Sequence, residues 1–228
     1  QALDHGFVEF GFSAFGEHHR FLAQLPGQVA HQAPELVEGG ADVPVAREVL
    51  TRKFGLVENA NFRIHPHKGI GQLPKNPLAK PDPKHQGLLD QLPAKLRGFS
   101  YQGDDVCVVV LADVDNYPCH NLLADLMQML LQLPERPARV LFGLAIEETE
   151  SWFIADSRAL KNAFPKAKLS KLPGTPDLII GAAEKLAEAL GHSERISGPD
   201  KYRWAEQIAP FLNLDTPPSP SFRKFIEG

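Results

Sequence analysis

Asp113 and Asp115 are the residues of this chain whose type and spacing point most directly to chemistry. They follow an apolar run, Val106–Ala112, which lacks the alternation of a half-exposed strand. The run therefore predicts a central strand of a parallel sheet that is covered on both faces. Two carboxylates that are two residues apart on an extended chain point the same way and repel each other. A bound cation would relieve that repulsion, whereas a polar turn with two solvated acids is the simpler alternative.

Acidic residues also follow two other predicted strands, and the carboxyl ends of parallel strands share one edge of a sheet. We therefore expect these acids to converge with Asp113 and Asp115. Oxygen-only ligands favour Mg²⁺ or Mn²⁺. One or two such ions can activate a water and stabilise an in-line phosphodiester displacement. The additional acids are Glu38 and Asp42 near the first strand, and Glu147, Glu148 and Glu150 after the fourth.

The elements that position these acids alternate between strand and helix patterns. Helical spacing of apolar residues predicts helices over 43–54 and 121–133, with Asp42 as the N-cap of the former, and a further helix that contains Pro93. This alternation predicts an α/β fold with a mainly parallel sheet flanked by helices. The four strands are predicted at 35–38, 61–65, 106–112 and 139–146.

After residue 157 the pattern changes to helices alone. Asp177 and Asp200 are predicted to cap two of them, Gly191 to end the first, and Pro220 to begin a last short helix. The chain is accordingly divided into an N-terminal extension at 1–33, an α/β domain at 34–157, and a helical C-terminal extension at 158–228 that packs on it.

Length and composition limit the classes of protein that remain. The 228 residues can bury one good core, and a formal net charge of −4 argues against uniform coating of nucleic acid. Two cysteines make no disulfide framework and suit a reducing compartment. Neither a membrane-spanning stretch nor a signal peptide is recognisable, so a cytoplasmic protein without membrane attachment is expected.

A family resemblance rests on the order of four short motifs. Val37-Glu-Gly-Gly-Ala-Asp42 before a helix, and Asp113-Val-Asp115 after an apolar strand, resemble the Toprim domain that topoisomerases, primases and OLD-type nucleases share. The string Ala145–Asp156, together with the tail Ser219-Pro-Ser-Phe222, is similar to a family of small stand-alone bacterial Toprim-like proteins. Members of that family are often encoded beside an ABC-type ATPase and are suspected of roles in genome defence. The resemblance covers roughly residues 35–228.

The resemblance implies a role for each matching acid. Glu38 would be the Toprim acid that serves as metal ligand or general base, and Asp113 and Asp115 would be the metal pair. Asp42 and Glu150 would help to bind a second ion, with Glu147 as a weaker candidate that could instead be a helix N-terminal charge. The chain departs from the family pattern in its first strand, where Pro34 and Glu35 leave only two apolar residues, Leu36 and Val37.

Basic residues offer a possible contact for a nucleic-acid backbone. Lys68 follows the second predicted strand, where it could meet a phosphate or simply belong to a turn. The stretch from 157 to 176 carries five basic residues and no acid, so it could hold a phosphate backbone, although solvated lysines are an equally good interpretation. These five residues are Arg158, Lys161, Lys166, Lys168 and Lys171.

Three functions compete at this stage. The first is a Mg²⁺- or Mn²⁺-dependent Toprim-type nuclease that acts on DNA or RNA, in a defence-type complex with an ABC-type ATPase. The second is a non-catalytic Toprim-like subunit that binds such an ATPase or a nucleic acid, and the third is another metal-dependent phosphotransfer enzyme. A homo-oligomer is compatible with each of them.

Overall fold

The computed structural model describes residues 33–103, 106–114, 118–174 and 176–227. The predicted N-terminal extension at 1–33 therefore lies almost entirely outside the described residues, and so does Asp115. Within the described ranges, every helix is too short or too polar to cross a lipid bilayer.

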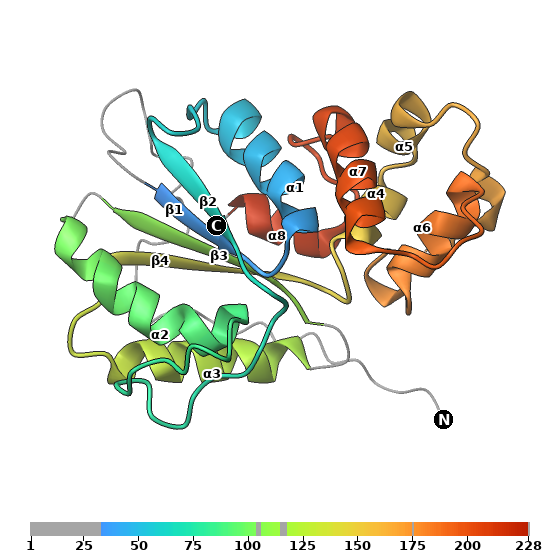
Figure 1. Ribbon diagram of the computed structural model, residues 1–228. Helices are drawn as coiled ribbons and strands as arrows, with labels where there is room; N and C mark the ends of the chain where they lie inside the picture. Colours follow the sequence, from blue (N-terminus) through green and yellow to red (C-terminus); the bar gives the residue numbers. More distant parts are fainter. Residues whose placement is uncertain (1–32, 104–105, 115–117, 175, 228) are drawn as a thin grey trace, which may run out of the picture.

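Four parallel strands form one sheet at the centre of the described chain (Figure 1). The strands are β1 (Ala33–Val37), β2 (Phe62–Pro66), β3 (Cys107–Asp113) and β4 (Arg139–Ala145), in the spatial order β2-β1-β3-β4. The prediction of a mainly parallel α/β sheet flanked by helices is confirmed, and each strand lies within two residues of its predicted position. Because β2 lies on one side of β1 and β3 on the other, the chain reverses its direction of winding between β1 and β3.

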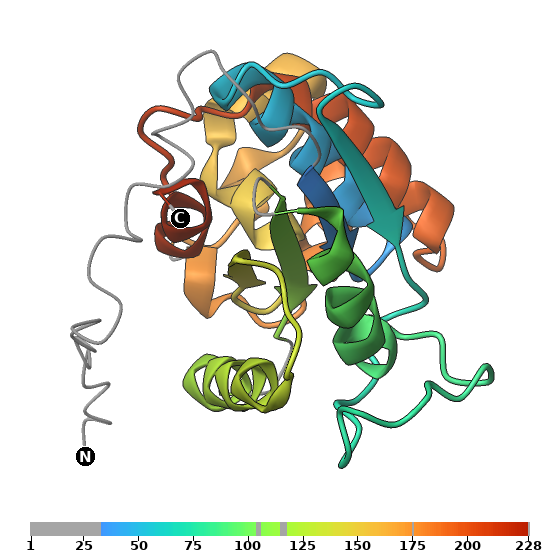
Figure 2. The same ribbon diagram turned by 90° about the vertical axis from the view of Figure 1, so that its left-hand side faces the viewer.

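Side chains of successive strand residues enter two different cores, one on each face of the sheet. Val108 and Val110 face α2 (Leu88–Phe99) and α3 (Cys119–Gln132). Val109 and Leu111 face the opposite side, which α1 (Val43–Glu48), its continuation as a π-helical turn at Val49–Lys53, and α8 (Pro220–Glu227) cover. Figure 2 shows the sheet between these two helical layers. Burial on both faces explains the uninterrupted apolar run of β3.

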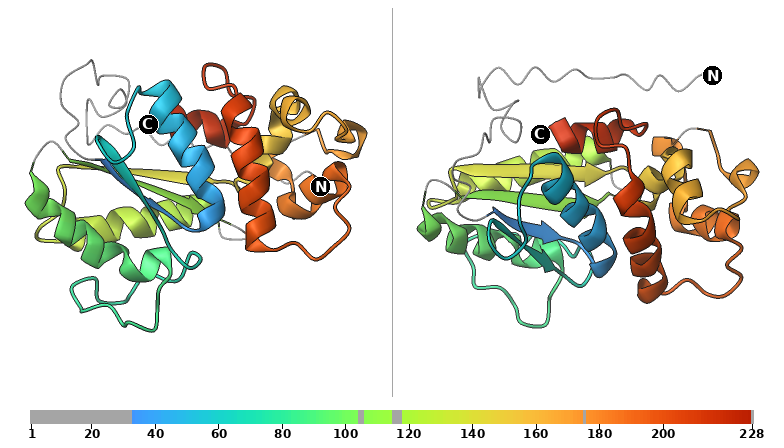
Figure 3. Two further views of the ribbon diagram at one scale, coloured as in Figure 1. Left: turned by 45° about the horizontal axis from the view of Figure 1, so that its top comes forward. Right: turned by 90° about the horizontal axis from the view of Figure 1, so that it is seen from above.

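The remaining helices lie beyond the carboxyl ends of the strands (Figure 3). The large core on the α1 face continues into them through Trp152, Leu186 and Trp204, so the predicted C-terminal extension shares a core with the α/β part. These helices are α4 (Glu150–Ala155), α5 (Ser157–Ala163), α6 (Ala182–Leu190) and α7 (Gly198–Ile208). Short 3₁₀ turns occupy Gly40–Asp42, Ser100–Gln102, Leu169–Lys171, Pro176–Leu178 and Ala209–Phe211.

Two predicted helix caps are wrong. Asp177 does not begin α6, since its carboxylate accepts hydrogen bonds from the Ser219 hydroxyl and the Ser221 amide, both at 2.7 Å. Asp200 is the third residue of α7, and Ser197 is the N-cap in a capping box with it. Neither acid is therefore an N-cap: Asp177 binds Ser219 and Ser221, and Asp200 accepts the Ser197 amide. The predicted end of α6 at Gly191 and the predicted start of α8 at Pro220 are confirmed.

The first strand forms despite Pro34 and Glu35. Pairing of β1 with β3 begins only at Glu35, so Pro34 lies where β1 pairs with β2 alone and its missing N–H interrupts no bond to β3. Glu35 is 0 % exposed, and neither of its carboxylate oxygens has a hydrogen-bond partner. Burial raises the pKa of Glu35 to about 8, and the nearby Asp42 adds to that increase.

The C-terminal helix α8 is fastened to the sheet through aromatic stacking. The Trp152 ring stacks on Phe222 at 4.5 Å and on Phe225 at 5.6 Å between ring centroids. The Trp152 indole N–H donates to the Ser221 hydroxyl at 2.8 Å. Gly143 of β4 lies directly under the Phe225 ring, where a β-carbon would overlap it. The absence of a side chain at Gly143 therefore allows α8 to contact β4.

Replacing Gly143 by alanine should lower the free energy of unfolding by about 1–3 kcal/mol, because the added methyl displaces the Phe225 ring and overpacks the contact. Gly98→Ala is the matched control, since nothing lies within 4 Å of a β-carbon added there in α2. That change should stabilise the protein by up to about 1 kcal/mol. Urea denaturation of both variants checks this, and equal effects would show that α8 does not lie on Gly143.

Replacing Glu35 by glutamine should change how stability depends on pH. The native state keeps the Glu35 proton up to about pH 8, whereas the unfolded chain loses it near 4.5. Wild-type stability should therefore fall, relative to Glu35→Gln, as pH rises through this window, by at most roughly 5 kcal/mol at about 1.4 kcal/mol per pKa unit. Denaturant unfolding between pH 4.5 and 8.5 measures the difference. Parallel curves would mean that Glu35 is not a buried protonated acid.

Candidate functional site

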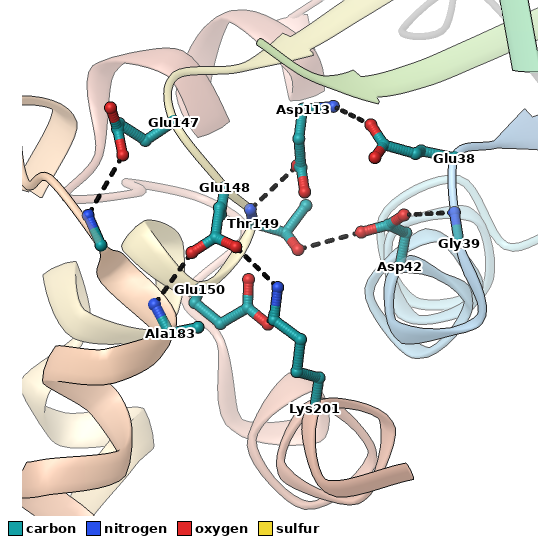
Figure 4. Close-up of polar contacts among 11 residues, drawn as sticks. Glu38, Gly39, Asp42, Asp113, Glu147, Glu148, Thr149, Glu150, Ala183 and Lys201 are labelled. Carbon is teal, nitrogen blue, oxygen red and sulfur yellow. Dashed lines mark hydrogen bonds and ion pairs between the residues drawn. The ribbon is translucent and has the colours of Figure 1, made fainter. Parts of the chain in front are cut away.

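The candidate site lies at the carboxyl edge of the sheet, between β1 and β3. This is the point where the winding of the chain reverses, and in open α/β sheets ligands bind at such a point. Glu38 directly follows β1, and Asp113 is the last residue of β3. The loop after β4 and the first turn of α4 bring Glu150 to the same edge (Figure 4). Of the acids predicted to converge, Glu38, Asp113 and Glu150 meet at this edge, whereas Asp115 lies outside the described residues.

Glu38 and Asp113 are joined through the backbone. The Glu38 amide donates to the Leu111 carbonyl at 3.2 Å, which extends the pairing of β1 with β3 by one residue. The Asp113 amide in turn donates to Glu38 Oε2 at 3.1 Å. Glu38 is partly exposed, whereas Asp113 is only 9 % exposed. The two carboxylates are thus fixed at neighbouring strand ends.

Asp42 reaches the site from the turn that precedes α1. Its Oδ2 accepts the Gly39 amide at 2.9 Å, and its Oδ1 accepts the Thr149 hydroxyl at 3.0 Å. Asp42 holds the N-cap position of α1 as predicted, but its side chain does not cap that helix. Its carboxylate instead ties the turn after β1 to the loop after β4.

Thr149 links Asp42 and Asp113, and sequence reasoning missed it. The Thr149 amide donates to Asp113 Oδ1 at 3.0 Å, while its hydroxyl donates to Asp42 Oδ1. Thr149 is 1 % exposed and lies between the two acids (Figure 4). A hydroxyl residue within an acidic string after a strand was the available signal, because such a residue can donate to buried carboxylates on two other elements.

Lys201 is the second residue that sequence reasoning missed. It rises from the first turn of α7, with its ammonium 2.7 Å from Glu148 Oε1 and 3.3 Å from Glu150 Oε1. Glu150 is 2 % exposed, and its other oxygen, Oε2, has no hydrogen-bond partner. No local pattern marks Lys201, which lies on an ordinary amphipathic helix far along the chain from the acids.

Glu147 and Glu148 bind the N-terminus of α6. Glu147 Oε2 accepts the Gly181 amide at 3.2 Å, and Glu148 Oε2 accepts the Ala183 amide at 2.9 Å. The first backbone N–H groups of a helix have no carbonyl acceptor within that helix, and the helix dipole favours negative charge at its N-terminus. Glu147 therefore binds the N-terminus of α6 and not that of the helix that follows it in the chain, α4, which begins at Glu150. It adopts a left-handed backbone conformation with φ at 64°.

The electrostatics of the site are those of carboxylates crowded away from water. Burial raises the pKa of Asp113 well above its usual range, and the neighbouring Asp42 carboxylate raises it further. Burial likewise raises the pKa of Asp42, and it raises that of Glu150 to about 7 although Lys201 opposes the change. Burial lowers the pKa of Lys201, but the adjacent glutamates reverse this, so its net pKa is raised and it stays charged.

The basic candidates lie outside this cluster. Lys68 is exposed, although the Gly69 amide beside it donates to the Glu38 carbonyl at 3.1 Å, so their turn borders the site. Lys161 donates to two backbone carbonyls at the end of α5, and Lys171 pairs with Glu188 at 2.8 Å. The side chains of Arg158, Lys166 and Lys168 are exposed.

The chemistry of the donors is of the kind that a hard divalent cation prefers, since Asp42, Glu150 and Glu38 lie near enough to Asp113 to add to the rise in its pKa that burial causes, and Glu150 Oε2 is buried without a hydrogen-bond partner. In their present orientation, no three His, Cys, Asp or Glu side chains of the described residues are grouped so as to hold a metal ion. Thr149 and backbone amides occupy several of the oxygens that a metal would need. Asp115, the other half of the predicted metal pair, lies outside the described residues.

No family model, curated protein or solved structure that we compared with this chain matches it. The resemblance to Toprim proteins therefore stays a prediction that rests on the sequence motifs alone.

Replacing Thr149 by valine should lower the free energy of unfolding by about 1–3 kcal/mol, because a buried Asp42 oxygen loses its donor. In an Asp42→Ala background the same change should cost much less, since the acceptor is already absent. A double-mutant cycle, measured by urea denaturation, gives the coupling free energy between the two side chains. A coupling near zero would show that the hydroxyl does not support Asp42.

Proposed function

We propose that this chain is a metal-dependent nuclease of the Toprim type, which hydrolyses phosphodiesters of DNA or RNA with Mg²⁺ or Mn²⁺. The observation that carries the proposal is the convergence of Glu38, Asp42, Asp113 and Glu150 at the carboxyl edge where the sheet reverses its winding. Carboxylates from separate elements are costly to bury together. A bound divalent cation would offset that unfavourable free energy, and a cation-dependent reaction would account for the burial of these acids.

Asp113 and Glu38 are the residues that would hold the ion, with Asp42 beside them. When bound, a divalent cation at such a site supplies an activated water and neutralises charge on the phosphorane-like transition state. Glu38 is less buried than the other three acids, so water reaches it, and we assign it the acceptance of the water's proton. Thr149 holds Asp42 and Asp113 in position through its hydroxyl and amide.

Substrate contact is assigned to exposed basic residues, because the chain as a whole is acidic and needs a local positive surface. Arg158, Lys166 and Lys168 have exposed side chains, and Lys68 borders the site. The resemblance to stand-alone Toprim-like proteins supports an ABC-type ATPase partner in a cytoplasmic defence complex. That partner would deliver the nucleic acid or permit its cleavage.

A non-catalytic subunit that binds an ATPase or a nucleic acid is the second candidate. It is favoured by the absence, among the described residues, of a three-residue group that could hold a metal as oriented. The hydrogen bonds from Thr149 and the ion pairs of Lys201 also satisfy much of the cluster without any metal. The two candidates differ in whether cleavage occurs at all.

Glu38→Gln and Asp113→Asn should each reduce metal-dependent cleavage by roughly 10²–10⁴-fold, because each removes a charge that binds the ion or accepts the proton. Glu147→Gln is the matched control, since that residue binds the N-terminus of α6 and its loss should leave cleavage within a few-fold of wild type. The assay uses linear, supercoiled and single-stranded DNA and RNA, with Mg²⁺ or Mn²⁺, with and without the ATPase.

Undiminished cleavage by the Glu38 and Asp113 variants would refute the site assignment. If wild type cleaves nothing under any of these conditions while still binding the ATPase, the non-catalytic candidate is correct. Circular dichroism and unfolding curves of each variant establish that any loss of cleavage is not a loss of fold.

A further inference from the structure

Basic side chains line one face of β2, the outer strand of the sheet next to β1. Phe62 of this strand packs on the other face, in a small core with the π-helical turn. The alternate residues Arg63, His65 and His67 therefore point to the α2 side. The His65 ring confirms this direction, since its centroid lies 6.2 Å from that of Phe99 in α2. Side chains two residues apart on a strand are about 6.6 Å from each other, so these three span about 13 Å.

Lys95 of α2 adds a further positive group beside these side chains. Burial lowers the pKa of both His65 and His67, and the charge of Lys95 lowers each of them further. Among the described residues no carboxylate opposes these shifts, and the side chains of Arg63 and Lys95 form no ion pair or hydrogen bond. The four groups therefore disfavour one another's positive charge without a compensating anion. They are called the basic row below: Arg63, His65, His67 and Lys95.

The basic row ends at the candidate site. The His67 amide donates to the Val37 carbonyl at 3.1 Å, and the imidazole Nδ1 of the same residue lies 2.9 Å from that oxygen. A carbonyl oxygen only accepts, so Nδ1–H donates to it and fixes the ring, while Nε2 has no hydrogen-bond partner. Val37 directly precedes Glu38 in the chain. Lys68, whose turn borders the site, directly follows His67. A ligand that lies along the row therefore reaches the carboxyl edge.

We propose that the basic row binds the phosphate backbone of a single nucleic-acid strand and leads that strand to the acids of the candidate site. The inference rests on the proposed function and specifies the surface along which its substrate lies. Uncompensated cations favour an anion, and a row on an extended strand matches a polyanion with repeating charges better than one compact phosphate. Phosphate contacts position a strand without reading its bases, so binding is independent of base sequence. The row is separate from the basic stretch at 158–171, which lies among the helices beyond the strand ends (Figure 3).

The test measures binding of fluorescein-labelled single-stranded DNA and RNA oligonucleotides by fluorescence anisotropy, without divalent ions so that no metal-dependent cleavage occurs. The double variant Arg63→Gln/Lys95→Gln should weaken binding by roughly tenfold or more at about 0.1 M salt, because two phosphate contacts are lost. The slope of log affinity against log salt should become shallower by about 1.4, at about 0.7 per contact with a single strand. Oligothymidine and a mixed sequence should show the same losses.

The matched control is Arg136→Gln/Lys185→Gln, which removes two exposed charges away from β2, one before β4 at the opposite edge of the sheet and one on α6. This control should leave affinity and slope near those of wild type. Lys95→Arg keeps the charge and should keep wild-type binding. If variants at the half-buried Lys95 do not fold, Arg63→Gln alone, at an exposed position, should still reduce the slope by about 0.7.

The outcomes separate this inference from the nuclease proposal. An unchanged salt slope in the basic-row variants, equal losses in the control, or no binding by wild type would overturn the inference, whether or not the protein cleaves nucleic acid. Reduced binding by the basic-row variants would support it even if wild type cleaves nothing with Mg²⁺ or Mn²⁺. That combination would refute the nuclease proposal and leave the non-catalytic candidate that binds a nucleic acid.

Discussion

Repulsion among buried carboxylates is the constraint on which the arrangement around the carboxyl edge depends. Asp42, Asp113 and Glu150 are each less than 10 % exposed, so burial raises the pKa of each carboxyl, and a neighbouring acid raises it further. A cluster of this kind is stable only if donors or cations compensate it. The fold supplies these from the strand ends, from the loops that follow them and from helices of the C-terminal part that lie beyond the strand ends.

The compensation combines three kinds of donor. Backbone amides of Gly39, Asp113 and Thr149 donate to the strand-end acids. The Thr149 hydroxyl serves Asp42, and the N-terminus of α6 serves the two glutamates that follow β4. Lys201 contributes a full positive charge through its contacts with Glu148 and Glu150. Because these donors come from different elements, movement of α6 or α7 would leave a carboxylate of the cluster without its donor.

The sheet and the convergence of its acids could be predicted from the sequence, because both follow from local patterns. An apolar run without alternation indicates a doubly covered strand, and the carboxyl ends of parallel strands meet at one edge. Glu38 and Asp113 were found in this way. Thr149 and Lys201 were not, because their roles depend on which element packs against which. Similarly, Asp177 looks like a helix cap in its local sequence, but tertiary packing presents it with Ser219 and Ser221 instead.

The contact of α8 with β4 has a consequence for the order of assembly during synthesis. Trp152 lies two residues after Glu150, and the rings that stack on it, Phe222 and Phe225, leave the ribosome some seventy residues later. Lys201 also emerges after every acid that it contacts. A nascent chain that ends before α7 thus carries the acids without their counter-charge and without the aromatic cover over β4. The carboxyl edge can therefore reach its final geometry only after translation of α8, which ties completion of the site to completion of the chain segment through 227.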